Sequence, residues 1–328
     1  MNTTDRRQPS TLPYWIISLL ALIVFAATLP SLAGNLKTQT IPALQPTAMP
    51  VPASTATSAL PTAVPAPGAV SSTTSGTASP LLPVGQASPW KLVFQDEFEG
   101  HALDGSKWTT CYPWFDPAGG CTNEGNHELE WYLPQAVTVA GGSVTLRADH
   151  GPYTGTNGTV YPYTSGMIAS GATPSTDPRF VYQYGYAEAR LKLPAGKGLW
   201  PAFWLAPADG TWPPEVDIAE RVGGTSPDKV EMVLHFALPQ GGHDSSITEF
   251  EGPDFQAEWH VFGLEWTPDE LTWYIDGVMR KHYTKVKNIP QKPMYPIVSL
   301  AVLGRRPPDA SVQFPATMSV DYVRVWQR

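Results

Sequence analysis

The chain has 328 residues, a formal net charge of -8 and a charged fraction of only 15%. This length accommodates one large domain or two small ones. An acidic chain without clusters of basic residues argues against nucleic acid as a partner. The chain also carries 12 Trp and 13 Tyr, which suit a β-rich domain and can stack on sugar rings.

Residues 1–34 have the pattern of an export signal. Arg6 and Arg7 precede an apolar run, and Ser31 and Ala33 place small residues before Gly34. The run is long for a signal peptide and short for a membrane span, so cleavage after Ala33 and retention of residues 14–33 as a membrane anchor both remain open. In either case we expect the rest of the chain to be extracellular, either secreted or tethered to the outer face of the cytoplasmic membrane.

Residues 35–89 are predicted to be a disordered linker. No charged residue occurs between Thr38 and Trp90, and the stretch consists largely of Pro, Ala, Ser, Thr and Val. Such a composition cannot bury a core and favours an extended tether. This linker would hold the following domain away from a membrane or wall.

The two cysteines, Cys111 and Cys121, flank a loop rich in Gly and Pro. No histidine or second cysteine pair completes a zinc-binding pattern. In an exported protein the two thiols are predicted to form a small loop-closing disulfide, with two free thiols as the alternative.

Residues 90–328 are predicted to form one all-β domain. Short alternating runs are separated by turn signals, and no window keeps a helical period over ten residues. We expect two antiparallel sheets packed as a sandwich of the jelly-roll kind. The clearest expected strands cover 136–140 and 143–147 as one hairpin, 186–193, 271–275 and 278–283 as a second hairpin around Asp276-Gly277, and 318–326.

Three carboxylates lie close together in an otherwise apolar stretch, Trp212 to Glu220. Glu215 and Asp217 have the same parity and therefore share one face of a strand. Glu220 has the opposite parity, but a β-bulge at Ile218-Ala219 would return it to the same face. Clustered acids repel one another and raise at least one pKa. The alternative is an edge strand that carries solvated acids by chance.

Cleavage of a glycosidic bond with retention needs two carboxyl groups about 5 Å apart. With the bulge, Glu215 is predicted to be the nucleophile and Glu220 the acid/base. Asp217 would orient the nucleophile, and its charge would help to keep the acid protonated.

Aromatic residues near the acids are candidates for sugar binding. Trp200 and Trp204 share a face of the preceding strand and would either stack on sugars or belong to the core. Trp212 lies in a loop at the expected mouth of the site. His235, a single histidine on an apolar strand, is either structural or bonded to one of the acids.

The stretch from Glu215 to Glu220 resembles the E-x-D-x-x-E signature of glycoside hydrolase family 16, in its bulged, laminarinase-like branch. The resemblance covers nearly all of residues 90–328. It implies a concanavalin-like β-jelly roll with an open cleft on the concave face, and a retaining, endo-acting mechanism. Further matching segments follow in the family's order: Phe94–Gly100, Asn126–Tyr132, Tyr163–Ile168, Tyr184–Arg190, Trp200–Trp204, Phe262–Trp266 and Asp321–Val325.

The resemblance also implies roles for individual residues. It makes Glu215 the nucleophile, Asp217 the helper and Glu220 the acid/base, and it places Trp200, Trp204 and His235 near the scissile bond. Glu130 and Trp131 fall in a segment expected to contact sugar. Family members often hold a structural calcium ion, for which Glu97 and Asp321 are the matching carboxylates.

The sequence departs from the family pattern at two places. Arg305 and Arg306 stand near where a Gly-Gly pair and a Trp are usual, and an amide is replaced by the acid Glu130. Neither change touches the catalytic acids. Both leave the exact glucan open, and the two arginines leave room for an anionic polysaccharide.

The sequence therefore predicts an exported, tethered and monomeric endo-β-glucanase that cuts β-1,3 or mixed β-1,3/1,4 linkages without a catalytic cofactor. One alternative is a hydrolase or transglycosylase of another polysaccharide, such as a galactan or a bacterial exopolysaccharide. An alternative of another class is a non-catalytic glycan-binding module, because fold alone does not determine function.

Overall fold

A computed structural model describes residues 81–87, 89–112, 120–171, 177–224 and 226–328. The predicted export segment and most of the predicted linker lie outside these ranges. None of the helices within the described ranges has the length and apolar character needed to cross a membrane. The roles assigned to residues 1–34 and 35–89 therefore stay predictions.

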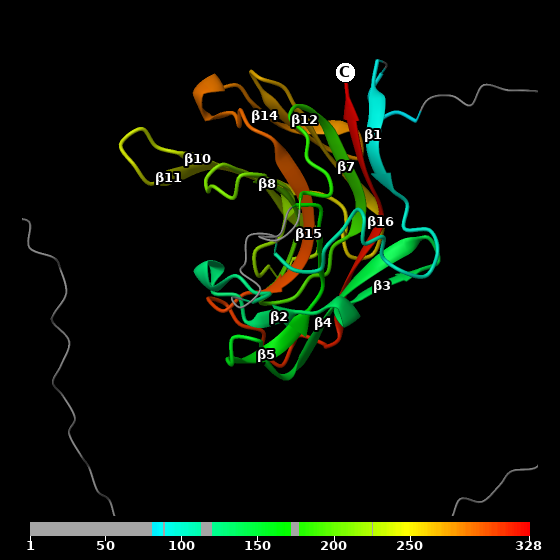
Figure 1. The fold of residues 1–328 in the computed structure, drawn as a ribbon, viewed down its shortest axis with the longest axis vertical. Helices are drawn as coiled ribbons and strands as arrows, with labels where there is room; N and C mark the ends of the chain where they lie inside the picture. Colours follow the sequence, from blue (N-terminus) through cyan, green and yellow to red (C-terminus); the bar gives the residue numbers. More distant parts are fainter. Residues whose placement is uncertain (1–80, 88, 113–119, 172–176, 225) are drawn as a thin grey trace, which may run out of the picture. The chain divides into compact units, whose positions relative to one another are not determined.

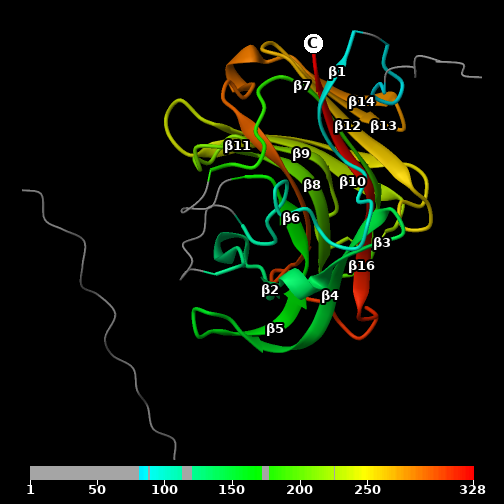
Figure 2. The same ribbon diagram turned by 45° about the vertical axis from the view of Figure 1, so that its right-hand side comes forward.

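The described chain forms two β-sheets (Figures 1 and 2). The larger sheet has the order β14-β13-β12-β7-β16-β4-β5-β2, with β1 added beside β16 and β3 beside β4. Its ten strands are β1 (Lys91–Asp96), β2 (Glu130–Tyr132), β3 (Val137–Ala140), β4 (Ser143–Thr154), β5 (Val160–Ser165), β7 (Gly185–Lys192), β12 (His260–Trp266), β13 (Leu271–Ile275), β14 (Val278–Tyr283) and β16 (Ala316–Gln327).

The smaller sheet has the order β11-β10-β9-β8-β15-β6. Its central strands curve strongly, as β8 and β15 show in Figure 1. Its six strands are β6 (Met167–Ala169), β8 (Leu199–Pro207), β9 (Glu215–Glu220), β10 (Lys229–Ala237), β11 (His243–Glu251) and β15 (Met294–Val302).

The prediction of an all-β sandwich is confirmed. The helical segments of the described residues are three short 3-10 turns, at Glu124–Asn126, Pro134–Ala136 and Val286–Asn288. Every strand pair is antiparallel except β2 with β5, which run parallel.

Both predicted hairpins are present, and their turns explain them. Gly141 and Gly142 connect β3 to β4 with φ values of 60° and 72°, and Asp276 and Gly277 connect β13 to β14 with φ values of 51° and 74°. Two successive left-handed residues match the right-handed twist of the flanking strands. Gly and Asp tolerate this backbone region better than most residues.

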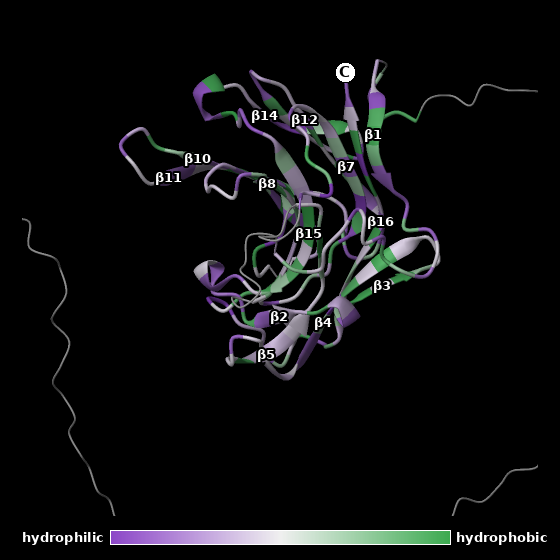
Figure 3. Cartoon of the chain, viewed as in Figure 1, coloured by the Kyte–Doolittle hydropathy of each residue, from purple (hydrophilic) through white to green (hydrophobic). Residues whose placement is uncertain are grey.

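One continuous apolar core fills the space between the sheets. Phe203 and Ile218 contribute from the smaller sheet, and Phe262 and Trp273 contribute from the larger one. Apolar and polar residues follow one another along single strands (Figure 3), as expected when one face of a strand is buried and the other is not.

Ordered contacts begin inside the predicted linker, before Trp90. The indole nitrogen of Trp326 donates a hydrogen bond of 2.8 Å to the carbonyl oxygen of Leu81. The backbone nitrogen of Val84 donates one of 2.7 Å to the buried carboxylate of Glu188. The folded unit therefore starts earlier than the composition change suggests, because buried side chains of the sandwich bind this segment's backbone.

Cys111 and Cys121 form a disulfide bond. Cys121 packs against a small apolar cluster that contains Tyr112, Tyr132 and Trp204. The disulfide thus lies beside one of the aromatic residues that the sequence predicts for the site, Trp204.

Glu97 and Asp321 do not fit the predicted calcium site. Both oxygens of Glu97 accept hydrogen bonds from the guanidinium of Arg324, at 2.8 and 2.7 Å. Asp321 accepts a hydrogen bond of 2.8 Å from Arg190. A carboxylate already neutralised by an arginine is a poor ligand for a hard cation, so we assign both residues to structural ion pairs.

Candidate active site

The centre of the smaller sheet is β9, which carries the three clustered acids. On the β8 side Ala219 lies opposite Phe203 and Asp217 opposite Trp204, so Ile218 has no partner. On the β10 side the same stretch of β9 also spans one residue more than its partner strand. This is the β-bulge that the parity of the acids predicts.

The bulge brings all three acids to one side of β9. Ile218 points into the core and is 1% exposed. Glu215, Asp217 and Glu220 instead line a single pocket. Its other lining residues are Tyr112, Asn126, Glu128, Trp200, Ala202, Trp204, Ser299 and Ala301.

Glu220 is the acid best suited to hold a proton at neutral pH. Its side chain is buried, and it accepts a hydrogen bond of 2.7 Å from the indole nitrogen of Trp200. Burial raises the pKa of Glu220 to about 8, with the hydrogen bond from Trp200 opposing the shift and the charge of Glu215 adding to it. At pH 7 the group is therefore a carboxylic acid.

Glu215 stands at the edge of the pocket and loses its proton before Glu220. Burial raises its pKa to about 7, against a hydrogen bond of 3.2 Å from the indole nitrogen of Trp212. The pKa of Asp217 lies well above its usual value, because the group is buried and because Glu220 and Glu215 lie beside it. The pocket thus gives the two glutamates different pKa values, and Glu215 ionises before Glu220 as the pH rises.

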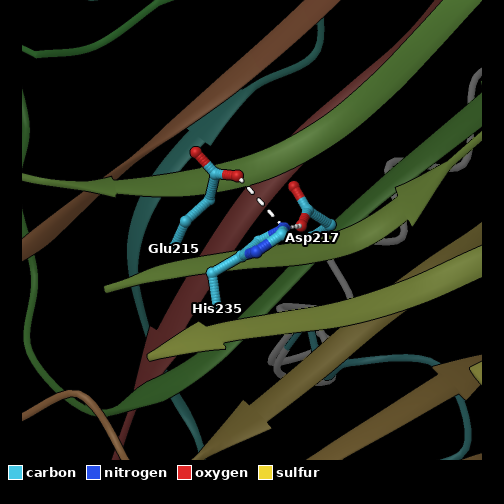
Figure 4. A group of neighbouring side chains, drawn as sticks. All are labelled: Glu215, Asp217 and His235. Carbon is cyan, nitrogen blue, oxygen red and sulfur yellow. Dashed lines mark ion pairs between the residues drawn. The ribbon is translucent and has the colours of Figure 1, made fainter. Parts of the chain in front are cut away.

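His235 approaches the acids from β10, where it lies opposite Glu215. Its Nε2 atom is 3.6 Å from Glu215 and 3.5 Å from Asp217 (Figure 4). Burial lowers the pKa of His235 to about 4, so the ring is neutral at pH 7 and these contacts are not charged pairs. His235 therefore lies beside two of the acids, and the cleft role that the family resemblance implies stays a prediction.

The same three side chains are also the candidate metal ligands of the described region. One ligand atom each from Glu215, Asp217 and His235 lies within 4.8 Å of the other two. Carboxylate and imidazole are donors that suit several divalent cations. A bound ion would occupy the carboxylates that an acid-catalysed reaction uses.

The three predicted tryptophans all lie at the acids. Trp200 and Trp204 line the pocket from β8, and Trp204 donates a hydrogen bond of 3.2 Å to the hydroxyl of Ser299. Trp212 is 53% exposed, with its ring centroid 4.6 Å from that of His243 on β11. The aromatic ring of Trp212 therefore lies beside Glu215, with that of His243 next to it. The sequence did not single out His243, because only the β10–β11 hairpin brings it there.

Glu130 and Trp131 do not line the pocket. Glu130 is fully buried and accepts a hydrogen bond of 2.8 Å from the backbone nitrogen of Val302. Trp131 is 3% exposed and packs against Tyr161, with ring centroids 5.2 Å apart. The expectation that these two side chains contact sugar is wrong, because β2 directs both of them into the protein.

Glu128, which precedes β2, takes the place expected for Glu130. It lines the pocket and accepts a hydrogen bond of 3.0 Å from the hydroxyl of Tyr112. Burial, followed by the charge of Glu130, raises the pKa of Glu128 well above its usual value. Glu128 lies in the segment Asn126–Tyr132, whose resemblance to the family was the sequence signal for this site. The spacing of the two acids in that segment did not show which of Glu128 and Glu130 faces the pocket.

Glu128 also borders a second pocket. Arg305 lines this pocket together with His127 and Glu124. One of the two departures from the family pattern therefore lies directly beside the candidate site, with charges of both signs around it.

A family model described as glycosyl hydrolases family 16 matches residues 125–324, which include all three acids. The chain belongs to this family. A second model, described as beta-glucan synthesis-associated protein SKN1/KRE6/Sbg1, matches residues 1–213 and ends before Glu215. The family 16 match is the one that covers the acid strand.

Several curated proteins are similar to this family 16 chain. Endo-1,3-1,4-beta-glycanase EglC of Rhizobium meliloti is 35% identical over 250 residues, covering 71% of this chain and 51% of EglC. Glucan endo-1,3-beta-glucosidase A1 of Niallia circulans is 35% identical, covering 72% and 38%. Beta-glucanase of Rhodothermus marinus is 31% identical, covering 74% and 87%. The chain spans about half or less of the length of the first two relatives.

Solved structures of the family agree with the fold. The endo-beta-1,3-glucanase of Pyrococcus furiosus is 34% identical, with a TM-score of 0.61 over 73% of this chain and 94% of that one. The laminarinase catalytic domain of Thermotoga maritima is 30% identical, with a TM-score of 0.63 over 74% and 99%. The two-sheet sandwich is thus the fold of family 16 laminarinases.

Proposed function

We propose that this protein is an endo-acting β-glucanase that cuts β-1,3 or mixed β-1,3/1,4 linkages with retention of configuration. The observation that carries the proposal is the bulge in β9, which gathers two carboxyl groups with raised pKa values, about 7 for Glu215 and about 8 for Glu220, in one pocket. Relatives named as an endo-1,3-1,4-beta-glycanase, a glucan endo-1,3-beta-glucosidase and an endo-beta-1,3-glucanase support the choice of substrate.

In the first step the carboxylate of Glu215 attacks the anomeric carbon and forms a glycosyl ester. The bond from that carbon to the glycosidic oxygen breaks, and Glu220 transfers its proton to the departing oxygen. Burial supports this role, because it keeps Glu220 protonated at the pH at which Glu215 ionises.

In the second step the deprotonated Glu220 takes a proton from water, whose oxygen attacks the anomeric carbon. The ester bond breaks and Glu215 leaves as a carboxylate, so both acids return to their starting states. Two displacements at the same carbon give net retention.

Neighbouring side chains orient the two acids. The indole of Trp200 holds Glu220, and the indole of Trp212 holds Glu215. Asp217 lies between them, and its Oδ2 has no hydrogen-bond partner among the described residues. When protonated, it can donate a hydrogen bond to Glu215 and stabilise the negative charge that develops there when the ester breaks.

The aromatic residues give the pocket its affinity for sugar. The exposed Trp212 offers a ring face on which the apolar face of a glucose unit stacks, and Trp204, 7% exposed, lines the pocket from the apolar cluster. We further propose that residues 1–34 export the domain and that residues 35–89 tether it outside the cytoplasm, where polysaccharides are found.

The test is the release of reducing ends from laminarin, lichenan, agarose and an acidic exopolysaccharide. We expect the wild type to cleave laminarin or lichenan and Glu215→Gln to cleave neither. Glu97→Gln, on an arginine-paired acid outside the pocket, serves as the matched control and should retain activity. Laminarin binding without cleavage of any polymer would establish a glycan-binding module instead. Cleavage that survives in Glu215→Gln would disprove the assignment of the nucleophile.

A second candidate substrate is an anionic polysaccharide, because Arg305 lines the pocket that adjoins the acids. Preferential cleavage of the acidic exopolysaccharide, lost in Arg305→Ala but not in the control, would favour it. The carboxylates of Glu124 and Glu128 in the same pocket oppose an anion, which is why a neutral glucan is preferred.

A further inference from the structure

Two polar side chains from the opposite sheet bond the backbone at the bulge in β9 and at the strands beside it. These are Trp273 of β13 and Lys281 of β14, which lie directly opposite each other in neighbouring strands of the ten-stranded sheet (Figure 2). Neither residue lines a pocket of the candidate site. Both cross the core: Trp273 reaches the backbone of β9, and Lys281 reaches the backbone of β10 and β11.

Trp273 bonds the backbone immediately before the bulged residue. Its side chain is fully buried, and its indole nitrogen donates a hydrogen bond of 2.9 Å to the carbonyl oxygen of Asp217. The next residue, Ile218, is the one without a partner on β8. A bulge disturbs the ladder locally, and a buried carbonyl without a donor costs about 1–3 kcal/mol. The indole supplies that donor.

Lys281 bonds the neighbouring strands at the same level. Its ammonium group donates hydrogen bonds of 2.8 Å to the carbonyl of Met232 and 2.5 Å to the carbonyl of Ser246. Met232 lies on β10 between Glu231 and Val233, which are the residues that flank the bulge across the ladder. The ammonium also lies 4.5 Å from the centroid of the Trp273 ring.

Burial of the Lys281 ammonium group costs free energy, which indicates that its hydrogen bonds have a structural or functional role. Lys281 is 7% exposed, and none of the described carboxylates forms an ion pair with it. Its charge is balanced only by backbone carbonyls, the face of an indole, and longer-range attraction from Asp217. An aliphatic residue would fill the same core volume at lower cost but could not bond the carbonyls.

We propose that Trp273 and Lys281 are positioning residues that hold the bulge and thereby keep Glu220 on the same face as Glu215. The inference rests on the proposed function, because it concerns the relation between those two acids. Glu215 precedes the bulge and Glu220 follows it. Loss of the bulge would shift the end of β9 by one residue and turn Glu220 towards the core.

The main test compares Trp273→Phe with Trp266→Phe in the full-length chain. Trp266 is equally buried, and its indole nitrogen also donates to a backbone carbonyl, that of Pro290, at 3.1 Å. Both substitutions keep an aromatic ring and remove one buried donor. We expect similar losses of thermal stability, but a loss in kcat of about 10- to 100-fold on β-glucan for Trp273→Phe alone, with KM unchanged.

The kind of leaving group then separates a displaced acid from a general loss of activity. A dinitrophenolate departs without a proton, and azide attacks the glycosyl ester without giving one up. With a dinitrophenyl β-glycoside and azide, Trp273→Phe should therefore recover nearly wild-type turnover and form the β-glycosyl azide. A loss of kcat that persists on this substrate would contradict the inference.

If Trp273→Phe does not fold, Lys281→Met tests the positioning role instead. This substitution keeps the length of the side chain and removes the two hydrogen bonds of the ammonium group. We expect the same effects on kcat, on KM and on the dependence on leaving group as for Trp273→Phe. Equal kcat losses in Trp273→Phe and Trp266→Phe, or none in any variant, would overturn the inference.

A crystal structure of either variant tests the bulge itself, whatever the substrate of the enzyme proves to be. We expect Glu220 to have left the pocket or the strand to have shifted at Ile218. An unchanged bulge in both variants would disprove the positioning role even if the proposed function holds. A lost bulge would support that role even if the wild type cleaves no β-glucan.

Discussion

Two groups of acids in the sandwich have opposite kinds of partner. In the pocket over the smaller sheet, Glu215 and Glu220 are held by indole nitrogens, and the one basic side chain paired with this group in the described structure is the neutral His235. On the larger sheet, Glu97 and Asp321 each face an arginine at hydrogen-bonding distance.

This difference determines what each acid can do. An arginine that donates hydrogen bonds to a carboxylate occupies its oxygens, so the acid contributes to the fold and not to proton transfer. A buried acid without a cation holds its proton to a higher pH, at a cost in stability. Acids that can transfer protons at neutral pH are therefore expected where counter-charges are missing.

The largest expected effect comes from removing one acid of the unpaired group. Glu220→Gln should lower kcat on β-glucan by about 10²- to 10⁴-fold, because a general acid contributes that much. Reducing-end assays measure the loss, with Glu97→Gln as the control from the paired group. Comparable losses in both variants would remove the distinction between the two kinds of acid.

The pH dependence of kcat/KM should reflect the same group. Activity should fall by about tenfold per pH unit above about pH 8, as Glu220 loses its proton, and should fall below about pH 7, as Glu215 gains one. In Glu220→Gln, the fall above pH 8 should disappear. A basic limb that is unchanged in this variant would show that another group supplies the proton.

Stability should respond in opposite directions in the two regions. The folded protein holds the proton of Glu220 up to about pH 8, against a usual value of 4.5, so this group lowers stability as pH rises through that window. Glu220→Gln should therefore stabilise the protein at pH 8 by roughly 1–3 kcal/mol relative to its effect at pH 4.

Arg324→Gln should instead destabilise the protein by about 1–2 kcal/mol, because Glu97 loses a bidentate partner. Urea unfolding at both pH values measures these differences. Stabilisation by Glu220→Gln that is equal at pH 4 and pH 8 would refute the electrostatic cause.

The smallest expected effect concerns calcium. Because Glu97 and Asp321 are both occupied by arginines, addition of calcium or of a chelator should change Tm by less than about 1 °C through these residues. A large calcium-dependent rise in Tm that is lost in Glu97→Gln would restore the metal site suggested by the resemblance.

Much of the fold and the centre of the site could be predicted from residues close together in the chain. The Gly141-Gly142 and Asp276-Gly277 turns specify their hairpins locally, and alternation specifies the buried face of each strand. The spacing of Glu215, Asp217 and Glu220 required a bulge, because a regular strand cannot place all three on one face.

The roles of Glu128, Glu130 and Trp131 could not be assigned in this way. β2 has only three residues, all of them buried, and it runs parallel to β5. Alternation over so short a strand does not distinguish a cleft-facing side chain from a core-facing one. The contact of Glu130 with Val302 joins positions 172 residues apart.

What the sequence determined by itself is therefore the set of turns, the strand periodicity and the single strand on which three acids must share a face, since these depend on neighbouring residues alone. The tertiary structure decided which acids are neutralised and which are not. Arg324 and Glu97 are 227 residues apart, and Trp273 and Asp217 are 56 residues apart. Only folding brings such partners together. The chemistry of each carboxylate depends on those partners, because burial and nearby charge set its pKa.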